Sequence, residues 1–446
     1  MFHRKASEKI RIVENDGKPV SNTKVHINQI NHEFLFGCGA FETLPYTHGQ
    51  AVHNGNGVPL PVGPDGKKYT EEELKAAYAR LEDRMQKWLG LFNYGTLPFY
   101  WGGYEPEEGF PHTEQLMAAA NFLKSKDVKV KGHPLCWHTG CAPWLLKYDN
   151  ETILKKQIER IHRDVGNFKG VIDMWDVINE VVIMPVYDKY DNAITRICKE
   201  LGQVGLVKKV FDAAQEINPD GIFLINDFNL SAKYEKLISD CLEAGVPIKA
   251  IGLQSHQHQG VWTLEKTEEI LSRFEHFGLP IHFTENTIVA GPLVAPEITD
   301  LQDAHYNDDD ATPEMEQKQA EALEKMYRNL FENHPLVTAI TNWDFGDGAW
   351  LNAPSGVIRK DGSLKPSYKT LHHLIKEEWH TELDETTDSD GYILLEGYKG
   401  KYEISAGDKK VFFNLTKSSK NNSDSKQLLS YSCQMEACSL MLTKRR

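Results

Sequence analysis

The sequence contains no run of about 18 apolar residues, the length that a membrane-spanning helix requires. Basic residues are also scarce relative to acidic ones: 50 Lys and Arg stand against 64 Asp and Glu, which gives a formal net charge of −14. A chain this acidic lacks the basic surface that DNA or RNA binding requires. These shortages exclude a spanning membrane protein, disfavour a nucleic-acid partner and favour an uncharged ligand.

Cysteine usage indicates a protein of a reducing compartment without a cysteine metal site. The seven cysteines form an odd number, and none of their spacings is the C-x-x-C pattern of zinc and redox sites. The first twenty residues, MFHRKASEKIRIVENDGKPV, contain no apolar segment of the kind that a secretory signal has. We therefore expect a cytoplasmic location, while the oligomeric state is left open.

Eight short apolar runs alternate with amphipathic stretches from residue 31 onward. Helix start signals lie between them: Thr70 and Glu73 form a capping-box pattern, and Thr312 precedes a proline at a first helical position. Eight strand–helix units in about 350 residues predict an α/β protein built as a (β/α)8 TIM barrel. A doubly wound open sheet is the alternative, but no G-x-G-x-x-G follows the first run, so its nucleotide-binding form lacks support. The runs are His32–Gly37, Leu91–Leu97, Val128–Gly132, Ile172–Asp176, Ile222–Asn226, Ala250–Gln254, Ile281–Glu285 and Val337–Trp343.

The ends of the chain have a different pattern. Residues 1–30 alternate around the turn signal Asp16-Gly17 and predict an N-terminal β hairpin that precedes a catalytic barrel of residues 31–380. Residues 381–416 are strand-like and punctuated by turns, which predicts a small accessory β module that the N-terminal hairpin would complete. Residues 417–446 begin with a polar stretch, and we expect them to form a disordered tail.

Two of the predicted barrel strands end in glutamate. The fourth run leads into Asn179 and Glu180, and the seventh ends at Glu285. Barrel chemistry is carried out at these strand ends, so both carboxyl groups are expected in one cavity. Such a pair suits glycoside cleavage, in which one group protonates the leaving oxygen and the other attacks the anomeric carbon or activates water. Asn179 would hold a substrate hydroxyl; the plainer alternative is a glutamate that caps a helix.

Histidines follow the sixth run. Strand alternation places Gln254, His256 and His258 on one face, where His256 would hydrogen-bond the nucleophile. A metal-dependent hydrolase is an alternative, because His-x-His directs both imidazoles to one side, and His282 and Asp344 would complete the ligand set. A third interpretation is that these histidines are simply satisfied by the backbone.

Aromatic residues cluster at two other strand ends. His133, Trp137 and His138 follow the third run, and Trp343 and Trp350 lie in a Gly- and Asp-rich segment after the eighth. Indole rings present flat apolar faces to the C–H faces of sugars. Isolated tryptophans belong more simply to a core, but this segment favours substrate stacking. A non-catalytic carbohydrate-binding barrel would keep the tryptophans, and the presence of both glutamates argues against it.

Together these segments resemble glycoside hydrolase family 10, the xylanase family, over residues 31–380. The segment 175–180 is similar to the family's acid/base strand and 283–285 to its nucleophile strand, which implies that Glu180 is the general acid/base and Glu285 the nucleophile. The resemblance also implies that His256 contacts the nucleophile and that residues 132–138 hold the −1 sugar, which Trp343 and Trp350 cover. It implies a (β/α)8 barrel that retains anomeric configuration and needs no cofactor.

The chain departs from the family pattern on the sugar-binding side. Where the family usually has Glu-Asn-x-x-Lys, Leu97 and Tyr100 replace the Asn and Lys, and Trp101 follows. Three further replacements are Gly140 for the usual Gln, and Asn286 and Thr287 for the common Leu-Asp. A polar pocket thereby becomes aromatic and apolar, and Tyr100 and Trp101 are expected to touch the substrate. We expect a divergent branch that acts on a short oligosaccharide, a small β-glycoside or a different sugar rather than on polymeric xylan.

Overall fold

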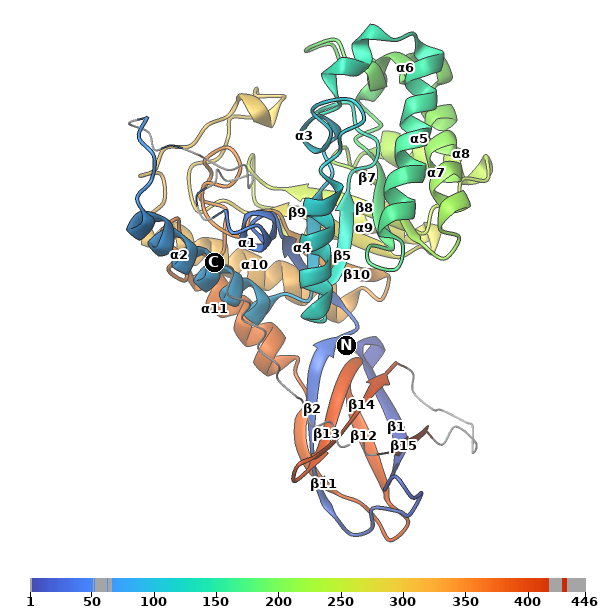
Figure 1. The fold of residues 1–446 in the computed structure, drawn as a ribbon, viewed down its shortest axis with the longest axis vertical. Helices are drawn as coiled ribbons and strands as arrows, with labels where there is room; N and C mark the ends of the chain where they lie inside the picture. The colour runs from blue at the N-terminus through green and yellow to red at the C-terminus, as the bar shows by residue number, and fades with distance from the viewer. Residues whose placement is uncertain (1, 51, 53–61, 63–65, 417–426, 431–446) are drawn as a thin grey trace, which may run out of the picture. The chain divides into compact units, whose positions relative to one another are not determined.

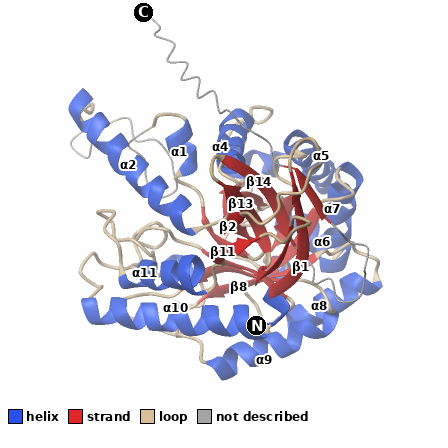
Figure 2. Ribbon diagram, turned by 90° about the horizontal axis from the view of Figure 1, so that it is seen from below, coloured by secondary structure: helices blue, strands red, loops and turns tan. Residues whose placement is uncertain are grey.

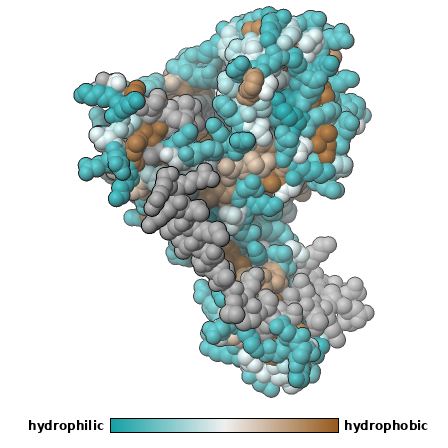
Figure 3. Space-filling view, viewed as in Figure 1, coloured by the Kyte–Doolittle hydropathy of each residue, from teal (hydrophilic) through white to brown (hydrophobic). Residues whose placement is uncertain are grey.

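The computed structural model describes residues 2–50, 52, 62, 66–416 and 427–430. The chain divides into two compact units: Leu35–Leu374 form one, and Met1–Phe34 together with Ile375–Arg446 form the other. Hydrophilic residues cover most of the surface seen in Figure 3, and hydrophobic residues form small separate patches among them. None of the helices in the described ranges combines the length and the apolar character that crossing a membrane demands.

The larger unit is a closed barrel of eight parallel strands, which confirms the predicted (β/α)8 fold (Figures 1 and 2). Each strand pairs with the next in the chain, and β10 closes the ring by pairing with β3. The eight predicted runs correspond to the eight strands, with the first strand beginning three residues later than expected. The strands are β3 (Leu35–Gly39), β4 (Tyr94–Pro98), β5 (Lys129–His133), β6 (Met174–Asn179), β7 (Ile222–Asp227), β8 (Ala250–His256), β9 (Ile281–Thr287) and β10 (Val337–Asn342).

Helices cover the outside of the barrel, as Figure 2 shows. The α-helices are α1 (Thr43–Thr47), α2 (Glu71–Leu91), α3 (Trp101–Tyr104), α4 (Thr113–Ser125), α5 (Asn150–Phe168), α6 (Ala193–Leu201), α7 (Gln203–Ile217), α8 (Ala232–Glu243), α9 (Leu264–Phe274), α10 (Pro313–Asn333) and α11 (Pro366–His373). Short 3-10 turns are η2 (Pro143–Lys147), η3 (Met184–Val186), η4 (Glu275–Phe277) and η5 (Leu301–Asp303). A π-helical turn, η6 (Leu374–Glu378), follows α11.

Local sequence signals set the starts of the two longest helices. Thr70 and Glu73 form the predicted capping box at α2, so that two of the unpaired backbone N–H groups at the helix start are satisfied. Thr312 caps α10 by accepting a hydrogen bond from the backbone of Met315, and Pro313 occupies the first helical position.

The barrel interior is apolar at one level and polar at its carboxyl end. Six strands each contribute one buried residue to a single apolar cluster. Interior layers of this kind make a TIM barrel a packed core rather than a pore. The polar residues His133, Asn179, Gln254, His256 and Glu285 come later in β5, β6, β8 and β9 or directly at their ends, so they gather at the carboxyl-terminal face. The cluster consists of Leu35, Tyr94, Met174, Leu224, Ala250 and Ala339.

The smaller unit contains two sheets, which confirms an accessory β module built from both ends of the chain. One sheet has the order β12-β1-β15 and the other β11-β2-β13-β14. Apolar residues of both sheets share one core cluster, as in sandwich packing. The strands are β1 (Lys5–Val13), β2 (Lys24–His32), β11 (Glu382–Thr386), β12 (Tyr392–Tyr398), β13 (Gly400–Ala406), β14 (Lys409–Leu415) and β15 (Gln427–Ser430); a 3-10 turn, η1 (Phe2–Arg4), precedes β1.

The N-terminal strands do not form the hairpin expected for residues 1–30. The turn at Gly17 is present, with the Gly17 amide donating to the Glu14 carbonyl at 2.8 Å, but only a single bridge joins Val13 and Pro19. β1 then pairs antiparallel with β12, while β2 pairs with β11 and β13 in the other sheet. Alternation identified the strands correctly, but partners far along the sequence decided the pairing.

The segment 417–446 differs from the expected tail at one place. Gln427–Ser430 form β15, which runs parallel to β1. The remaining residues of that prediction, 417–426 and 431–446, lie outside the described residues.

Candidate active site

A cavity of about 1470 Å³ lies at the carboxyl-terminal ends of the barrel strands, and both glutamates line it. Most of the other residues predicted for the site also line it: Tyr100, His133, Trp137, His138, Gln254, His256, Trp343 and Trp350. This is the face of the fold at which TIM-barrel enzymes carry their chemistry.

Both glutamates have an unusual backbone conformation. Glu180 directly follows β6 with φ of 58°, and Glu285 lies within β9 with φ of 55°. A non-glycine residue in the left-handed region costs free energy and persists where the surroundings impose it, most often at functional sites. The β9–β10 register also shifts between the pairs Phe283–Ile340 and Asn286–Asn342, which flank Glu285. Such an irregularity re-aims a side chain.

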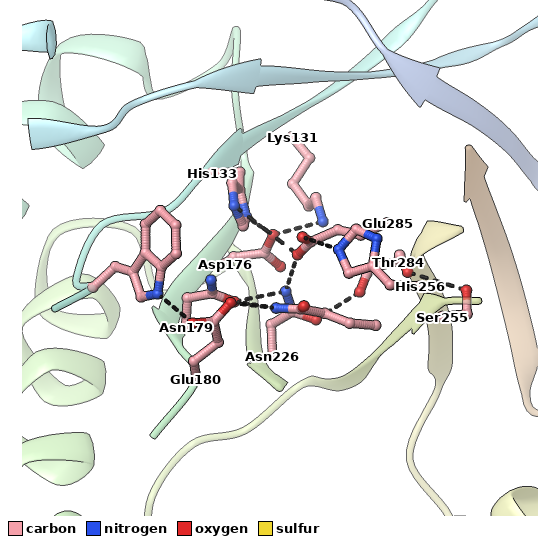
Figure 4. A network of polar contacts seen from close by, with 12 residues as sticks. Lys131, His133, Asp176, Asn179, Glu180, Asn226, Ser255, His256, Thr284 and Glu285 are labelled. Carbon is pink, nitrogen blue, oxygen red and sulfur yellow. Dashed lines mark hydrogen bonds and ion pairs between the residues drawn. The ribbon is translucent and has the colours of Figure 1, made fainter. Parts of the chain in front are cut away.

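Side-chain amides connect the two carboxyl groups (Figure 4). Gln254 Nε2 lies 3.2 Å from Glu180 Oε1 and 3.1 Å from Asn179 Oδ1. Asn226 Nδ2 donates to the same Asn179 oxygen at 2.8 Å and to Glu285 Oε1 at 2.7 Å. Thr284 Oγ1 in turn donates to Asn226 Oδ1 at 2.6 Å, which fixes that amide's orientation. The carboxyl groups are therefore held in one hydrogen-bonded network.

Glu285 is surrounded by groups that favour its charge. His256 Nε2 lies 3.2 Å from Glu285 Oε2, and His133 Nε2 lies 4.0 Å from Oε1. Burial favours the neutral acid, but His133, His256 and Lys131 together outweigh it and lower the pKa of Glu285 below its ordinary value. Glu285 is therefore ionised at neutral pH.

Glu180 has the opposite electrostatic environment. Burial, followed by the negative charge of Glu285, raises the pKa of Glu180 to about 8, even though Trp137 and Gln254 donate hydrogen bonds to it. Trp137 Nε1 lies 2.8 Å from Glu180 Oε2. Glu180 is therefore protonated at neutral pH, while its neighbour is not, and such a split indicates distinct acid and base roles.

The family model for glycosyl hydrolase family 10 matches residues 100–373, which is more than half of the chain. The chain belongs to glycosyl hydrolase family 10. It is 26% identical over 309 residues to an endo-1,4-beta-xylanase/feruloyl esterase of Xylanibacter ruminicola, covering 61% of this chain and 40% of that protein. It is 28% identical over 248 residues to a beta-1,4-xylanase of Dictyoglomus thermophilum, covering 52% of this chain and 64% of the relative.

Solved structures of the same family share the fold. Native xylanase 10B from Thermotoga maritima superposes with a TM-score of 0.55 at 25% identity, covering 67% of this chain and 90% of the other. A family 10 protein of Paenibacillus barcinonensis superposes with a TM-score of 0.58 at 20% identity, covering 76% of this chain and 94% of the other.

Aromatic rings surround the glutamates of this family 10 chain. Tyr100 lies 5.8 Å from His133 and 5.6 Å from Trp137 between ring centroids, and Trp343 lies 5.3 Å from His133. Trp350 lies 4.7 Å from His256. Tyr100 and the three indoles thus frame the cavity on several sides, as stacking on a sugar requires.

Two predicted substrate contacts are placed differently from the rest. Trp101 does not line the cavity; it is 3% exposed and donates to Glu105 Oε2 at 3.0 Å, with Arg160 over its ring. The helical turn of α3 directs Tyr100 and Trp101 to different sides, which their adjacency in sequence concealed. Asn179 does not line the cavity either, but it accepts hydrogen bonds from the amides of the network.

The alternative metal site is not assembled. His256 is engaged by Glu285 and by Thr287, and His282 is buried against Tyr94 rather than at the cavity. Among residues 2–50, 52, 62, 66–416 and 427–430, no three His, Cys, Asp or Glu side chains are grouped so that they could hold a metal ion.

Three important polar residues did not emerge as site residues from the sequence. Asn226 was recognised only as a strand end, yet it joins Asn179 to Glu285. Lys131 and Asp176 lie beneath the cavity: Lys131 Nζ lies 2.6 Å and His133 Nδ1 2.7 Å from the same Asp176 oxygen. Lys131 and Asp176 occur within otherwise apolar runs. A charged residue inside a buried strand is the signal that could have identified them.

The buried pair of Lys131 and Asp176 gives a prediction about stability. Both side chains are at most 1% exposed. We expect Asp176→Asn to lower the free energy of unfolding by about 3–5 kcal/mol, because a lysine without its counter-ion remains in the barrel. Thermal unfolding followed by circular dichroism measures this effect. The double variant Asp176→Asn with Lys131→Met is the control, and it should recover part of the loss; an unchanged melting temperature for Asp176→Asn alone would contradict the prediction.

Loops after two barrel strands meet beside the cavity. Lys189, in the loop after β6, lies 2.6 Å from Asp300 Oδ2 and 2.8 Å from Asp303 Oδ1, in the loop after β9. Tyr187 packs against His138 with 4.5 Å between ring centroids. All five residues line the cavity. The contact between these loops encloses the cavity on the side of His138.

Proposed function

We propose that the chain is a retaining β-glycoside hydrolase that cleaves β-1,4-xylosidic or related bonds in short oligosaccharides or small β-glycosides. The observation that carries this proposal is the pair of glutamates that line one cavity and are joined through side-chain amides, with a histidine in contact with Glu285 and an indole N–H in contact with Glu180. The opposite pKa shifts of the two carboxyl groups agree with it. Membership of glycosyl hydrolase family 10 and the relatives named as xylanases support the same reaction. The alternatives of a metal-dependent hydrolase and a non-catalytic binding barrel lack a comparable observation.

The first chemical step uses both glutamates. Glu285, ionised, attacks the anomeric carbon and forms a glycosyl-enzyme ester, while Glu180 donates its proton to the departing glycosidic oxygen. His256 and Asn226, which contact Glu285, orient its carboxylate for this attack. Trp137 and Gln254 orient Glu180 in the same way.

The second step follows from the change of charge. Once Glu285 is esterified, its negative charge is gone, so the pKa of Glu180 falls and its carboxylate can accept a proton from water. The water attacks the anomeric carbon from the face that the leaving group vacated. Two inversions at the same carbon give net retention.

The cavity favours a small substrate. Tyr100, which stands where the family usually has lysine, puts an aromatic ring beside His133 and Trp137. Leu97, in place of the usual asparagine, is fully buried and does not line the cavity. Elsewhere along the cavity, Lys189 joins the loops that follow β6 and β9. These two features support a preference for a disaccharide or an aryl glycoside over a long polymer.

Initial rates on paired substrates, with product analysis, test the proposal. The panel consists of aryl β-xyloside, β-glucoside and β-galactoside together with xylohexaose and soluble xylan. We expect cleavage of at least one aryl glycoside or short oligosaccharide, with the β-anomer as first product by proton NMR. Rapid internal cleavage of xylan would contradict the small-substrate specificity, and a first product of the α-anomer would contradict retention.

The pH dependence provides a further prediction. Because protonated Glu180 is the competent form, we expect kcat/KM to fall above pH 8, tenfold per pH unit, as this acid of pKa about 8 ionises. Lowering the pH toward 5 should leave Glu285 ionised, because its pKa lies below the ordinary value. Initial rates between pH 5 and 10 measure the profile. A constant kcat/KM up to pH 10 would contradict the assignment of Glu180.

A further inference from the structure

One buried aspartate ends a barrel strand and another lies just beyond one, and their surroundings differ. Asp227 ends β7, is fully buried and accepts hydrogen bonds from the backbone amides of Val182 and Asn229, both at 2.9 Å. Asp227 does not line the cavity, so its role is to hold the adjoining loops. Asp344 lies two residues beyond β10, is 3% exposed and does line the cavity.

Asp344 has few partners within the protein. Ser355 Oγ donates to Asp344 Oδ2 at 2.5 Å, and no backbone amide in the described part of the chain donates to this carboxyl group. Lys365, the cation that favours its charge, is bonded to Asp347 at 2.9 Å. A buried carboxyl group with so little compensation is costly to the fold. A hydrogen-bond donor from outside the protein would compensate it.

Asp344 follows Trp343, whose ring centroid lies 6.2 Å from that of His256, the histidine that contacts Glu285. Trp343, its neighbour in sequence, packs against His133 and Phe41 at 5.3 and 5.4 Å between ring centroids. Glu180 instead accepts hydrogen bonds from the side chains of Trp137 and Gln254. The leaving group departs next to Glu180, whereas the other sugar becomes attached to Glu285. The side of Trp343, whose ring packs against the two histidines beside Glu285, therefore suits that sugar.

We propose that Asp344 is a specificity-determining residue that accepts a hydrogen bond from one hydroxyl group of the sugar on the glycone side. The inference rests on the proposed glycosidase function. A carboxylate is acceptor-only and binds hydroxyl donors strongly in a buried site. Ser355 occupies one of its oxygens, which leaves Oδ1 for the sugar.

The electrostatic surroundings agree with this role. Burial, with a smaller contribution from Asp347, raises the pKa of Asp344 to about 7, while Ser355 and Lys365 act in the opposite direction. Tyr100 also faces this region; burial, then Glu285 and Glu180, and finally Asp176 and Asp344, raise its pKa. A sugar hydroxyl that donates to Asp344 favours the charged form, so the substrate and a proton compete for this group.

Deoxy substrates combined with a conservative variant test the proposal. The parent aryl glycoside and its 3-deoxy and 4-deoxy analogues are compared in the wild-type enzyme and in Asp344→Asn. In the wild type, loss of the recognised hydroxyl should lower kcat/KM by about 10- to 150-fold, the range for a hydrogen bond to a charged group. In Asp344→Asn the penalty at that hydroxyl should shrink to less than about fivefold, while the penalty at the other hydroxyl stays unchanged.

Ser355→Ala is the matched control, because it removes the internal hydrogen bond but keeps the carboxylate. It should preserve the wild-type discrimination among the deoxy substrates. If Asp344→Asn does not fold, the wild-type enzyme alone can test the proposal. The loss in kcat/KM caused by removing the recognised hydroxyl should become smaller as the pH is lowered from 8 to 6, across the pKa of Asp344.

Equal penalties for each deoxy substrate in the wild type and in Asp344→Asn would overturn the role of Asp344 while leaving the glycosidase function intact. The same conclusion follows if discrimination is flat across that pH range. Absence of hydrolysis for every β-glycoside in the panel would instead refute the proposed function itself.

Discussion

Replacing Glu285 by alanine is expected to lower kcat on an aryl β-glycoside by at least about 10⁴-fold, the scale on which removal of a nucleophile acts. Glu285 is 5% exposed, and hydrogen bonds from Asn226 and His256 hold its carboxylate in place, whereas alanine supplies no attacking oxygen there. Azide, a small anionic nucleophile, should enter the space that the carboxylate leaves and restore part of the rate. Attack by azide from that side yields the α-glycosyl azide, which proton NMR identifies.

A surface glutamate supplies the control for this experiment. Glu314 lies in the first turn of α10 and pairs with Lys318. Glu314→Ala should retain the wild-type kcat. Wild-type activity in Glu285→Ala, or formation of the β-glycosyl azide in that variant, would contradict the nucleophile assignment.

Glu180→Ala is expected to have an effect that depends on the leaving group. For a substrate whose leaving group needs protonation, we expect kcat/KM to fall by about 10²- to 10⁴-fold, because the general acid is lost. For an aryl glycoside with an acidic phenol, which departs without protonation, the loss in kcat/KM should be small. Azide should then accelerate turnover and yield the β-glycosyl azide, because it attacks the glycosyl-enzyme from the side of Glu180.

The comparison of leaving groups is the decisive measurement for this residue. Gln254→Ala is the matched variant, because Gln254 contacts Glu180 without supplying a proton. It should lower the rates on both classes of substrate by similar factors. If Glu180→Ala also lowered both classes equally, the residue would position the substrate rather than protonate the leaving group.

Opposite outcomes with azide make the two assignments independent. Each glutamate is expected to give a different anomer, so an exchange of roles between them would be visible in the products. Their backbone conformations are alike, with φ of 58° and 55°, and the difference in their roles arises from their neighbours. Histidines surround Glu285, whereas an indole N–H and an amide contact Glu180.

The sequence alone was sufficient to predict the barrel and its two glutamates. Parallel strands that are covered on both faces appear as short continuous apolar runs, so eight such runs were visible without knowledge of any contact. Caps at Thr70 and Thr312 depend on residues within one helical turn, so they too could be predicted. Glu180 and Glu285 were identified because each terminates an apolar run.

The tertiary structure decided which neighbouring side chains act together. Trp101 and Tyr100 are adjacent in sequence, yet only Tyr100 lines the cavity, because the turn of α3 separates their directions. In the sequence Asn226 is only a residue at the end of an apolar run. In the folded barrel it donates hydrogen bonds to both Asn179 and Glu285.

The pairing of strands that lie far apart in the chain could not be predicted from the sequence either. β1 and β2 alternate as a hairpin would, but they pair with strands from the other end of the chain. Periodicity and caps are local properties, so the sequence by itself determined the elements, the barrel and the two strand-end carboxyl groups. Burial, pKa and hydrogen-bond partners depend on residues from different strands, so only the folded chain decided that Glu180 is protonated, that Glu285 is charged and that Asp344 faces the cavity.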